Sequence, residues 1–214
     1  MSKTPEMIRN EKAGACLVKA LEGRCFEAYY CETKEEAKEK ALSLIPEGDV
    51  ISWGGCGTAE EIGLMDEIQS GKYKVIDRAT GKDRAESLQL MRQGLLADTY
   101  IAGTNAISED GQLVNIDGTG NRVAAMTFGP SNIIVVAGMN KVAKNVEDAL
   151  TRARSIAAPI NCQRFPDKKT PCVKTGLCGD CNSPDCICNY ISTIRRCSPP
   201  KKIKVILIGE KLGF

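Results

Sequence analysis

One short run, NIIVVA at residues 132–137, restricts the fold more than any other stretch of the chain. A near-continuous apolar strand is typical of a parallel sheet that is covered on both faces. Other short apolar runs predict further strands, at residues 26–31, 50–53, 74–76 and 204–208. Helical patterns alternate with them, at residues 5–21, 33–44, 83–96 and 146–157. This alternation predicts an α/β fold, a mostly parallel sheet with helices on both faces and right-handed crossovers.

Residues 97–122 carry a dense group of polar residues between short apolar pairs. The segment reads as a strand, a hairpin with Asp110-Gly111 at its turn, and a glycine-rich loop. In an open α/β sheet, ligands bind beyond the carboxyl ends of the strands. We therefore expect this segment to form the floor of a binding site.

Two glycine-rich loops, residues 54–58 and 118–122, are candidates for holding an anion. The first meets a predicted helix that starts at Thr58 with Glu61 as its capping partner, and backbone N–H groups at a helix start attract anions. The second ends in Arg122, whose guanidinium suits a phosphate or carboxylate. The alternative is that these glycines only permit tight turns. The predicted ligand-binding residues are Gly54, Gly55, Cys56, Thr58, Thr104, Asn105, Gly118, Gly120, Asn121 and Arg122.

Acid–base chemistry has few candidates, because the chain contains no histidine. Histidine triads, a histidine base and histidine metal ligands are thereby excluded. Glu109 and Asp117 are the predicted bases or nucleophiles, and Lys141 is predicted to hold an anion. Cys56 is either a reactive thiol at a helix N-terminus or a small buried side chain, the commoner outcome. Asp110 is explained by the hairpin turn alone.

Cysteines concentrate at the end of the sequence, where seven of the eleven lie in the last 53 residues and five lie within 172–188. The spacing Cys178-x-x-Cys181 brings two thiolates to one metal, and a Cys₄ site suits either Zn²⁺ or an iron–sulfur cluster. A disulfide knot or free thiols are the alternative. We expect the two thiols of Cys186-x-Cys188 to face opposite ways, so that one of the two is a ligand. The remaining early cysteines are expected in the core: Cys16, Cys25 and Cys31.

Charge and composition divide the chain near residue 161. Residues 162–214 hold ten Lys/Arg and four Asp/Glu (+6), whereas residues 1–161 hold nineteen and twenty-three (−4). We expect an α/β core at 1–161, a Cys-rich metal-binding segment at 162–200, and a final strand at 201–214 that returns to the core. The basic residues are scattered with few aromatics between them, so nucleic acid is not an expected partner. No signal peptide or membrane span is evident, and a cytoplasmic location is expected.

A series of motifs along the chain resembles the LUD-domain family, whose best-known members are lactate-utilisation proteins of the C type. These motifs are Trp53-Gly-Gly, Gly103-Thr-Asn-Ala-Ile107, Glu109-Asp-Gly-Gln-Leu113-Val-Asn115, Asp117-Gly118, Gly120-Asn-Arg122, Phe128-Gly-Pro130 and Asn140-Lys141-Val142. The tail resembles that of stand-alone members in Thr170-Pro-Cys172, Cys178, Asp180-Cys181 and Ile187-Cys188-Asn189.

The resemblance implies a fold of the phosphosugar isomerase and CoA-transferase type. It also implies a role in lactate oxidation beside iron–sulfur partner subunits. Members usually carry Ser at position 56 and a basic residue at 186, so the implied metal ligands are Cys172, Cys178, Cys181 and Cys188.

The leading hypothesis is a protein of lactate or small-carboxylate metabolism that binds an anionic metabolite beside a Cys₄ metal or iron–sulfur site. One alternative is a phosphosugar isomerase-like enzyme in which zinc is structural. Another is a binding or scaffold subunit without catalysis. A homodimer is the base-rate expectation for its assembly.

Overall fold

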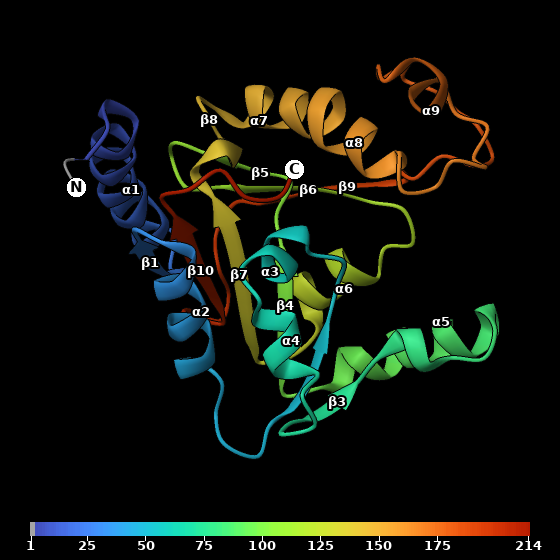
Figure 1. The fold of residues 1–214 in the computed structure, drawn as a ribbon, viewed down its shortest axis with the longest axis horizontal. Coiled ribbons are helices and arrows are strands. Elements are labelled where there is room, and N and C mark those ends of the chain that lie inside the picture. Colours follow the sequence, from blue (N-terminus) through green and yellow to red (C-terminus); the bar gives the residue numbers. More distant parts are fainter. Residues whose placement is uncertain (1–2) are drawn as a thin grey trace.

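Six parallel strands form the larger of two sheets in the structure, a computed structural model that describes residues 3–214 (Figure 1). Their order across the sheet is β1-β10-β7-β4-β2-β3. The strands are β1 (Glu27–Cys31), β2 (Val50–Trp53), β3 (Lys74–Ile76), β4 (Thr99–Gly103), β7 (Asn132–Gly138) and β10 (Ile203–Ile208). This arrangement confirms the predicted mostly parallel α/β sheet, and places the final strand, β10, between β1 and β7.

The apolar run in β7 is explained by two separate cores, one on each face of the sheet. Ile133 and Val135 pack into one core, while Ile134 and Val136 pack into the other. Successive side chains of a strand point to opposite faces, so a strand between two cores needs apolar residues at every position. All seven residues of β7 are buried.

Helices cover both faces of this sheet. Helices α1 and α6 contribute to one core, and α2, α3 and α4 contribute to the other. The bounds of these helices are α1 (Pro5–Gly23), α2 (Lys34–Ser43), α3 (Gly57–Glu61), α4 (Leu64–Ile68) and α6 (Asn121–Phe128). In Figure 1 α1 and α2 lie beside β1 and β10, and α3 and α4 lie in front of the sheet.

A second sheet of four strands, in the order β8-β5-β6-β9, lies across the upper part of the molecule in Figure 1. It contains the predicted hairpin, β5 and β6, which pair antiparallel on either side of Asp110-Gly111. Helix α7 packs on it over a third apolar cluster. The bounds are β5 (Ala106–Ser108), β6 (Leu113–Asp117), β8 (Val142–Ala143), β9 (Tyr190–Ile194) and α7 (Val146–Arg152).

The sequence did not predict β9, which comes from the Cys-rich segment and pairs antiparallel with β6. This pairing ties residues 190–194 to the hairpin, so the tail completes the second sheet. The rest of the tail contains α8 (Ala158–Cys162) and the short α9 (Pro171–Thr175).

Most predicted helices agree with the structure, with differences at their ends. The predicted helix over 83–96 is α5 (Arg84–Gln93) followed by a 3-10 turn, and the one over 146–157 is α7 followed by a π-helical turn at Ala153–Ala157. The helix predicted to begin at Thr58 begins at Gly57 instead, and its N-cap is Cys56, whose Sγ accepts the backbone N–H of Ala59 at 3.4 Å.

The expected burial of the early cysteines is correct for Cys31 and wrong for Cys16, which is exposed on α1. Cys25 is partly buried. No helix within residues 3–214 combines the length and the apolar character needed to cross a membrane.

Candidate functional site

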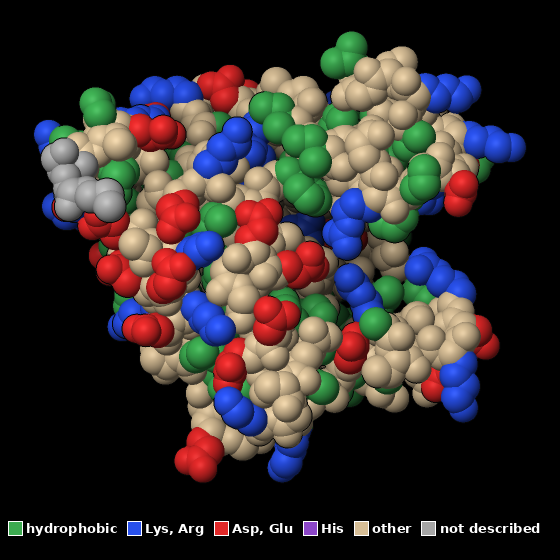
Figure 2. Space-filling view, viewed as in Figure 1, with side chains coloured by type: hydrophobic (Ala, Val, Ile, Leu, Met, Phe, Trp, Pro, Cys, Tyr) green, Lys and Arg blue, Asp and Glu red, His purple; other side chains and the backbone are tan. Residues whose placement is uncertain are grey.

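A cavity of about 350 Å³ lies where the carboxyl ends of β2, β4 and β6 meet. Its walls come from the loop after β2, the end of β4, the loop after β6, and the turn that follows β7. In Figure 2 the molecule is hollowed between the part that carries α9 and the part that carries α5, and Lys and Arg side chains gather there. We call the cavity the strand-end pocket.

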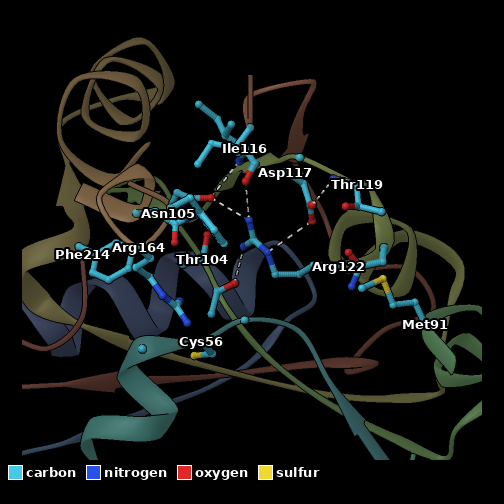
Figure 3. Close-up of a pocket in the computed structure, with 18 of the residues that line it drawn as sticks. Cys56, Met91, Thr104, Asn105, Ile116, Asp117, Thr119, Arg122, Arg164 and Phe214 are labelled. Atoms are coloured by element: carbon cyan, nitrogen blue, oxygen red, sulfur yellow. Dashed lines mark hydrogen bonds and ion pairs between the residues drawn. The ribbon is translucent and has the colours of Figure 1, made fainter. Parts of the chain in front are cut away.

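Arg122 lies in the middle of this site, and its guanidinium is hydrogen-bonded to other groups of the protein (Figure 3). It is 9% exposed. Burial lowers its pKa, and the neighbouring Asp117 opposes the shift. Its two terminal nitrogens donate four hydrogen bonds, to Gly103 O (2.8 Å), Asn115 Oδ1 (2.7 Å), Asn105 Oδ1 (2.9 Å) and Ile116 O (2.7 Å). Arg122 therefore holds the floor of the pocket together, with no terminal N–H left for the anion that the sequence predicted it would bind.

Asp117 lines the pocket and is also engaged. Its Oδ1 accepts the backbone N–H groups of Thr119 (3.2 Å) and Gly120 (3.1 Å), and its Oδ2 lies 3.6 Å from Nε of Arg122. These contacts fix the loop that leads into α6, since a carboxylate at a helix start satisfies free N–H groups.

Glu109, the other predicted base, is not among the residues that line the pocket. It lies at the hairpin turn, where its Oε2 pairs with Nζ of Lys144 at 2.6 Å and its side chain is 49% exposed. Catalysis by Glu109 at this pocket is not supported by its position.

Lys141 lines the pocket from a buried position. It is 4% exposed, and its Nζ donates to Thr58 Oγ1 at 3.0 Å. Burial lowers the pKa of Lys141, Cys56 opposes the shift, and the positive charge of Arg152 adds to it. Because an ammonium has three N–H donors, two remain for a ligand.

Cys56 lies beside Lys141 and is 5% exposed. Burial raises the pKa of the Cys56 thiol, and Lys141 opposes the shift. The structure thus favours the buried small side chain over the reactive thiolate.

Two further cations line the pocket and were not predicted. Arg78 follows β3, and Arg164 follows α8; Figure 3 shows Arg164 reaching toward the cavity. Within residues 3–214, no carboxylate lies within 4.0 Å of either side chain or of Lys141. Arg78 could have been predicted as a pocket residue, because it follows a strand of the parallel sheet. No sequence feature of this kind marks Arg164.

The other predicted ligand residues divide into two groups. The residues that line the pocket are Gly55, Cys56, Thr104, Asn105, Asp117, Gly118, Asn121, Arg122 and Lys141. Three lie outside its lining. Gly54 packs on the Arg122 side chain, Thr58 supports Lys141, and Gly120 begins α6.

A second cavity, of about 190 Å³, adjoins the strand-end pocket. Six cysteines line it, and Ile187 lines both cavities. We call it the cysteine cavity. The six are Cys162, Cys172, Cys178, Cys181, Cys186 and Cys188.

All eleven cysteines of the chain are free in the structure. The pKa of Cys188 is raised to about 12. Burial is the main cause, and the neighbouring thiols, above all Cys186, add to the shift. Cys186 and Cys188 line the same cavity, so the expectation that they face opposite ways is wrong. Residues two apart in an extended chain lie on the same face. Within residues 3–214, no three Cys, Asp or Glu side chains are grouped so that they could hold a single metal ion.

Residues 15–208 match the protein family described as the LUD domain. The chain belongs to the LUD domain family. The family predicted from the motifs is thereby confirmed, over most of the chain's length. No curated protein matches this LUD-domain chain.

Among solved structures, a DUF162 family protein from Deinococcus radiodurans is similar at 14% identity, covering 93% of this chain and 98% of that protein, with a TM-score of 0.53. This likeness concerns the fold. A ribose 5-phosphate isomerase A from Neisseria gonorrhoeae is similar at 20% identity over 53% of this chain and 56% of that protein, with a TM-score of 0.34.

Proposed function

We propose that this LUD-domain protein binds a small anionic metabolite, one that carries a carboxylate or phosphate group, in the strand-end pocket. The observation that carries the proposal is the unpaired positive charge of Lys141, Arg78 and Arg164 around one cavity. A charge as buried as Lys141 is costly without a counter-charge, and a bound anion would supply it.

The pocket offers few groups that compete with such a ligand. Among the described residues of its lining, Asp117 is the one with an acidic side chain, and its oxygens already accept hydrogen bonds from the α6 loop. Asn105 turns its Oδ1 toward Arg122 and the backbone N–H of Ile116, so its amide nitrogen is the group that remains for a ligand. The polar groups left in the pocket are therefore mainly donors and cations, which suit an anion.

The same geometry favours binding over isomerase chemistry. Sugar-phosphate isomerisation needs a group that removes a proton from carbon. Glu109 lies outside the pocket and Asp117 is held by the α6 loop. Lys141 is thus the predicted catalytic residue with free polar atoms in the pocket, and we assign it the role of holding the anion.

The positive charge around the pocket fits a small anionic metabolite, and about 350 Å³ is room enough for one. Small carboxylates of the kind handled in lactate utilisation are the class we propose, in keeping with the best-known members of the family.

Calorimetric titration with lactate, pyruvate, inorganic phosphate and ribose 5-phosphate tests the proposal. We expect a carboxylate to bind, and Lys141→Met to weaken that binding at least about tenfold, since a hydrogen bond to a charged group contributes about 1.5–3 kcal/mol. The matched control is Lys144→Met, which removes an exposed lysine that pairs with Glu109 outside the pocket. Absence of binding by all four compounds, or equal binding by Lys141→Met, would contradict the proposal.

A further inference from the structure

The cysteine cavity gathers thiols from three successive segments of the chain, all within residues 162–188. Cys162 ends α8, Cys172 lies in α9, and the other four lie in the loop before β9. Outside this cavity the remaining five cysteines are scattered among α1, the turn between α1 and β1, β1 itself, the loop after β2 and the turn before β10. A fold with no need for thiols at one place would not be expected to bring six of eleven together.

Polar contacts join several of these thiols. The Oγ1 of Thr170 lies 3.3 Å from Sγ of Cys162 and 3.3 Å from Sγ of Cys172. The backbone N–H of Cys188 donates to Sγ of Cys186 at 3.3 Å. Hydrogen bonds to sulfur are among the features that tune thiolate-bound iron–sulfur centres.

The loop that carries Cys178 and Cys181 is fastened to the α/β core. Asp180, between the two cysteines, has a positive φ of 45° and pairs with Arg154 of the π-helical turn. This ion pair joins the Cys-x-x-Cys loop to the π-helical turn. Arg154 also lines the cavity and adds positive charge beside the thiols.

The arrangement of the thiols distinguishes between two kinds of metal site. A single zinc ion requires four donors about 2.3 Å from one point, and no three donors in residues 3–214 are grouped in that way. In a [4Fe–4S] cluster each thiolate binds a different iron, so the sulfurs stand apart around the walls of a cavity with the cluster between them. Six thiols around about 190 Å³ of space fit the second arrangement.

We propose that the cysteine cavity binds a polynuclear iron–sulfur cluster held by thiols of its lining. As its ligands we take Cys172, Cys178, Cys181 and Cys188, the set that the family resemblance implies. Cys162 is fully buried and reaches Cys172 through the Thr170 hydroxyl, and the sulfur of Cys186 accepts the N–H of Cys188. Cys162 and Cys186 are the two thiols of the lining that remain outside this set.

The cluster would adjoin the strand-end pocket. Ile187 lines both cavities, and a Cβ added to Gly118 would stand 3.3 Å from the Ile187 backbone. An iron–sulfur cluster supplies single-electron transfer when bound. This inference does not depend on anion binding, because the two sites use different side chains.

Anaerobic purification of the full chain, reconstitution with Fe²⁺ and sulfide, and analysis for iron, acid-labile sulfide and zinc provide the test. We expect a coloured protein with iron and sulfide in equal amounts, and an electron paramagnetic resonance signal in its paramagnetic state. Cys178→Ser should lose the colour and the sulfide, whereas Cys16→Ser, which changes an exposed cysteine on α1, should keep both. Cys186→Ser should also keep both.

Circular dichroism and anion titration of Cys178→Ser separate loss of the cluster from loss of the fold, because the strand-end pocket should keep its affinity in that variant. Bound zinc without sulfide, no metal after reconstitution, or a full cluster in Cys178→Ser would overturn the inference. Loss of the cluster in Cys186→Ser would overturn the assigned ligand set.

Discussion

The Nη1 atom of Arg122 donates to the Oδ1 atom of Asn115 across 2.7 Å, and both side chains are buried. The amide nitrogen of Asn115 has no partner within the described part of the chain, residues 3–214. Turning the amide over would place its nitrogen against the arginine, so the oxygen must face Arg122. Arg122 has the type and position expected of an anion-binding residue, but its contacts make it a structural cation of the protein interior.

Arg122→Met should destabilise the protein severely. The change leaves two backbone carbonyls, Gly103 and Ile116, and the Asn115 oxygen without their donor. Removing one partner from a buried charged network costs about 3–5 kcal/mol, which we expect to appear as a lower midpoint in urea denaturation with an unchanged slope.

The matched control for this change is Arg92→Met, because Arg92 is exposed on α5. Its free energy of unfolding should stay within about 0.5 kcal/mol of the unaltered protein. If Arg122→Met behaved like this control, the guanidinium would have to be free for a ligand.

Anion binding in the strand-end pocket should depend on the charge of Lys141. Burial lowers the pKa of Lys141 below the ordinary value of 10.5. Below this lowered pKa the ammonium is charged and affinity is full. As the pH rises through it, the charge and the affinity are lost, before an ordinary lysine would titrate. Titration calorimetry with pyruvate from pH 6 to about 10 would show the fall.

An arginine at this position offers a comparison, because a guanidinium stays charged over the whole range. If Lys141→Arg retains binding, its affinity should not fall in that window. A flat profile in the unaltered protein over this whole pH range would contradict the role of Lys141.

Cys56 should react slowly with an alkylating reagent. It is 5% exposed and burial raises its thiol pKa, whereas Cys16 is exposed. Thiolates are the reactive species, so at pH 8 iodoacetamide should label Cys16 at least about tenfold faster, as followed by peptide mass spectrometry. In denaturant the two rates should converge. Equal alkylation rates of Cys56 and Cys16 in the native protein would mean that Cys56 is a reactive thiol.

The larger sheet could be predicted from sequence because each strand carries its own signal. The alternation of the two cores along β7 requires an apolar residue at every position, which the run at 132–137 displays. β9 lacks such a signal. Its residues, YISTI, are half exposed, and their strand conformation depends on pairing with β6, more than seventy residues earlier.

The site was predictable in location and less so in the roles of its residues. Strand ends and glycine-rich loops marked the pocket, since both are local patterns. The role of Arg122 depends on acceptors contributed by β4, β6 and the loop between β4 and β5, which meet only in the folded chain. Arg164 reaches the pocket through the path of α8, which no local pattern describes.

The hairpin turn supports a last prediction, that Gly111→Ala destabilises the protein by about 2 kcal/mol or more. Gly111 has φ of +85°, a left-handed conformation that costs other residues about 1–2 kcal/mol. An added Cβ would also stand 2.8 Å from the backbone of Ala20 and Leu21 in α1.

Gly23→Ala is the control, because nothing lies within 4 Å of its added Cβ. In a helix that change should stabilise by up to about 1 kcal/mol. Equal thermal midpoints for the two variants would mean that the hairpin does not rest on α1.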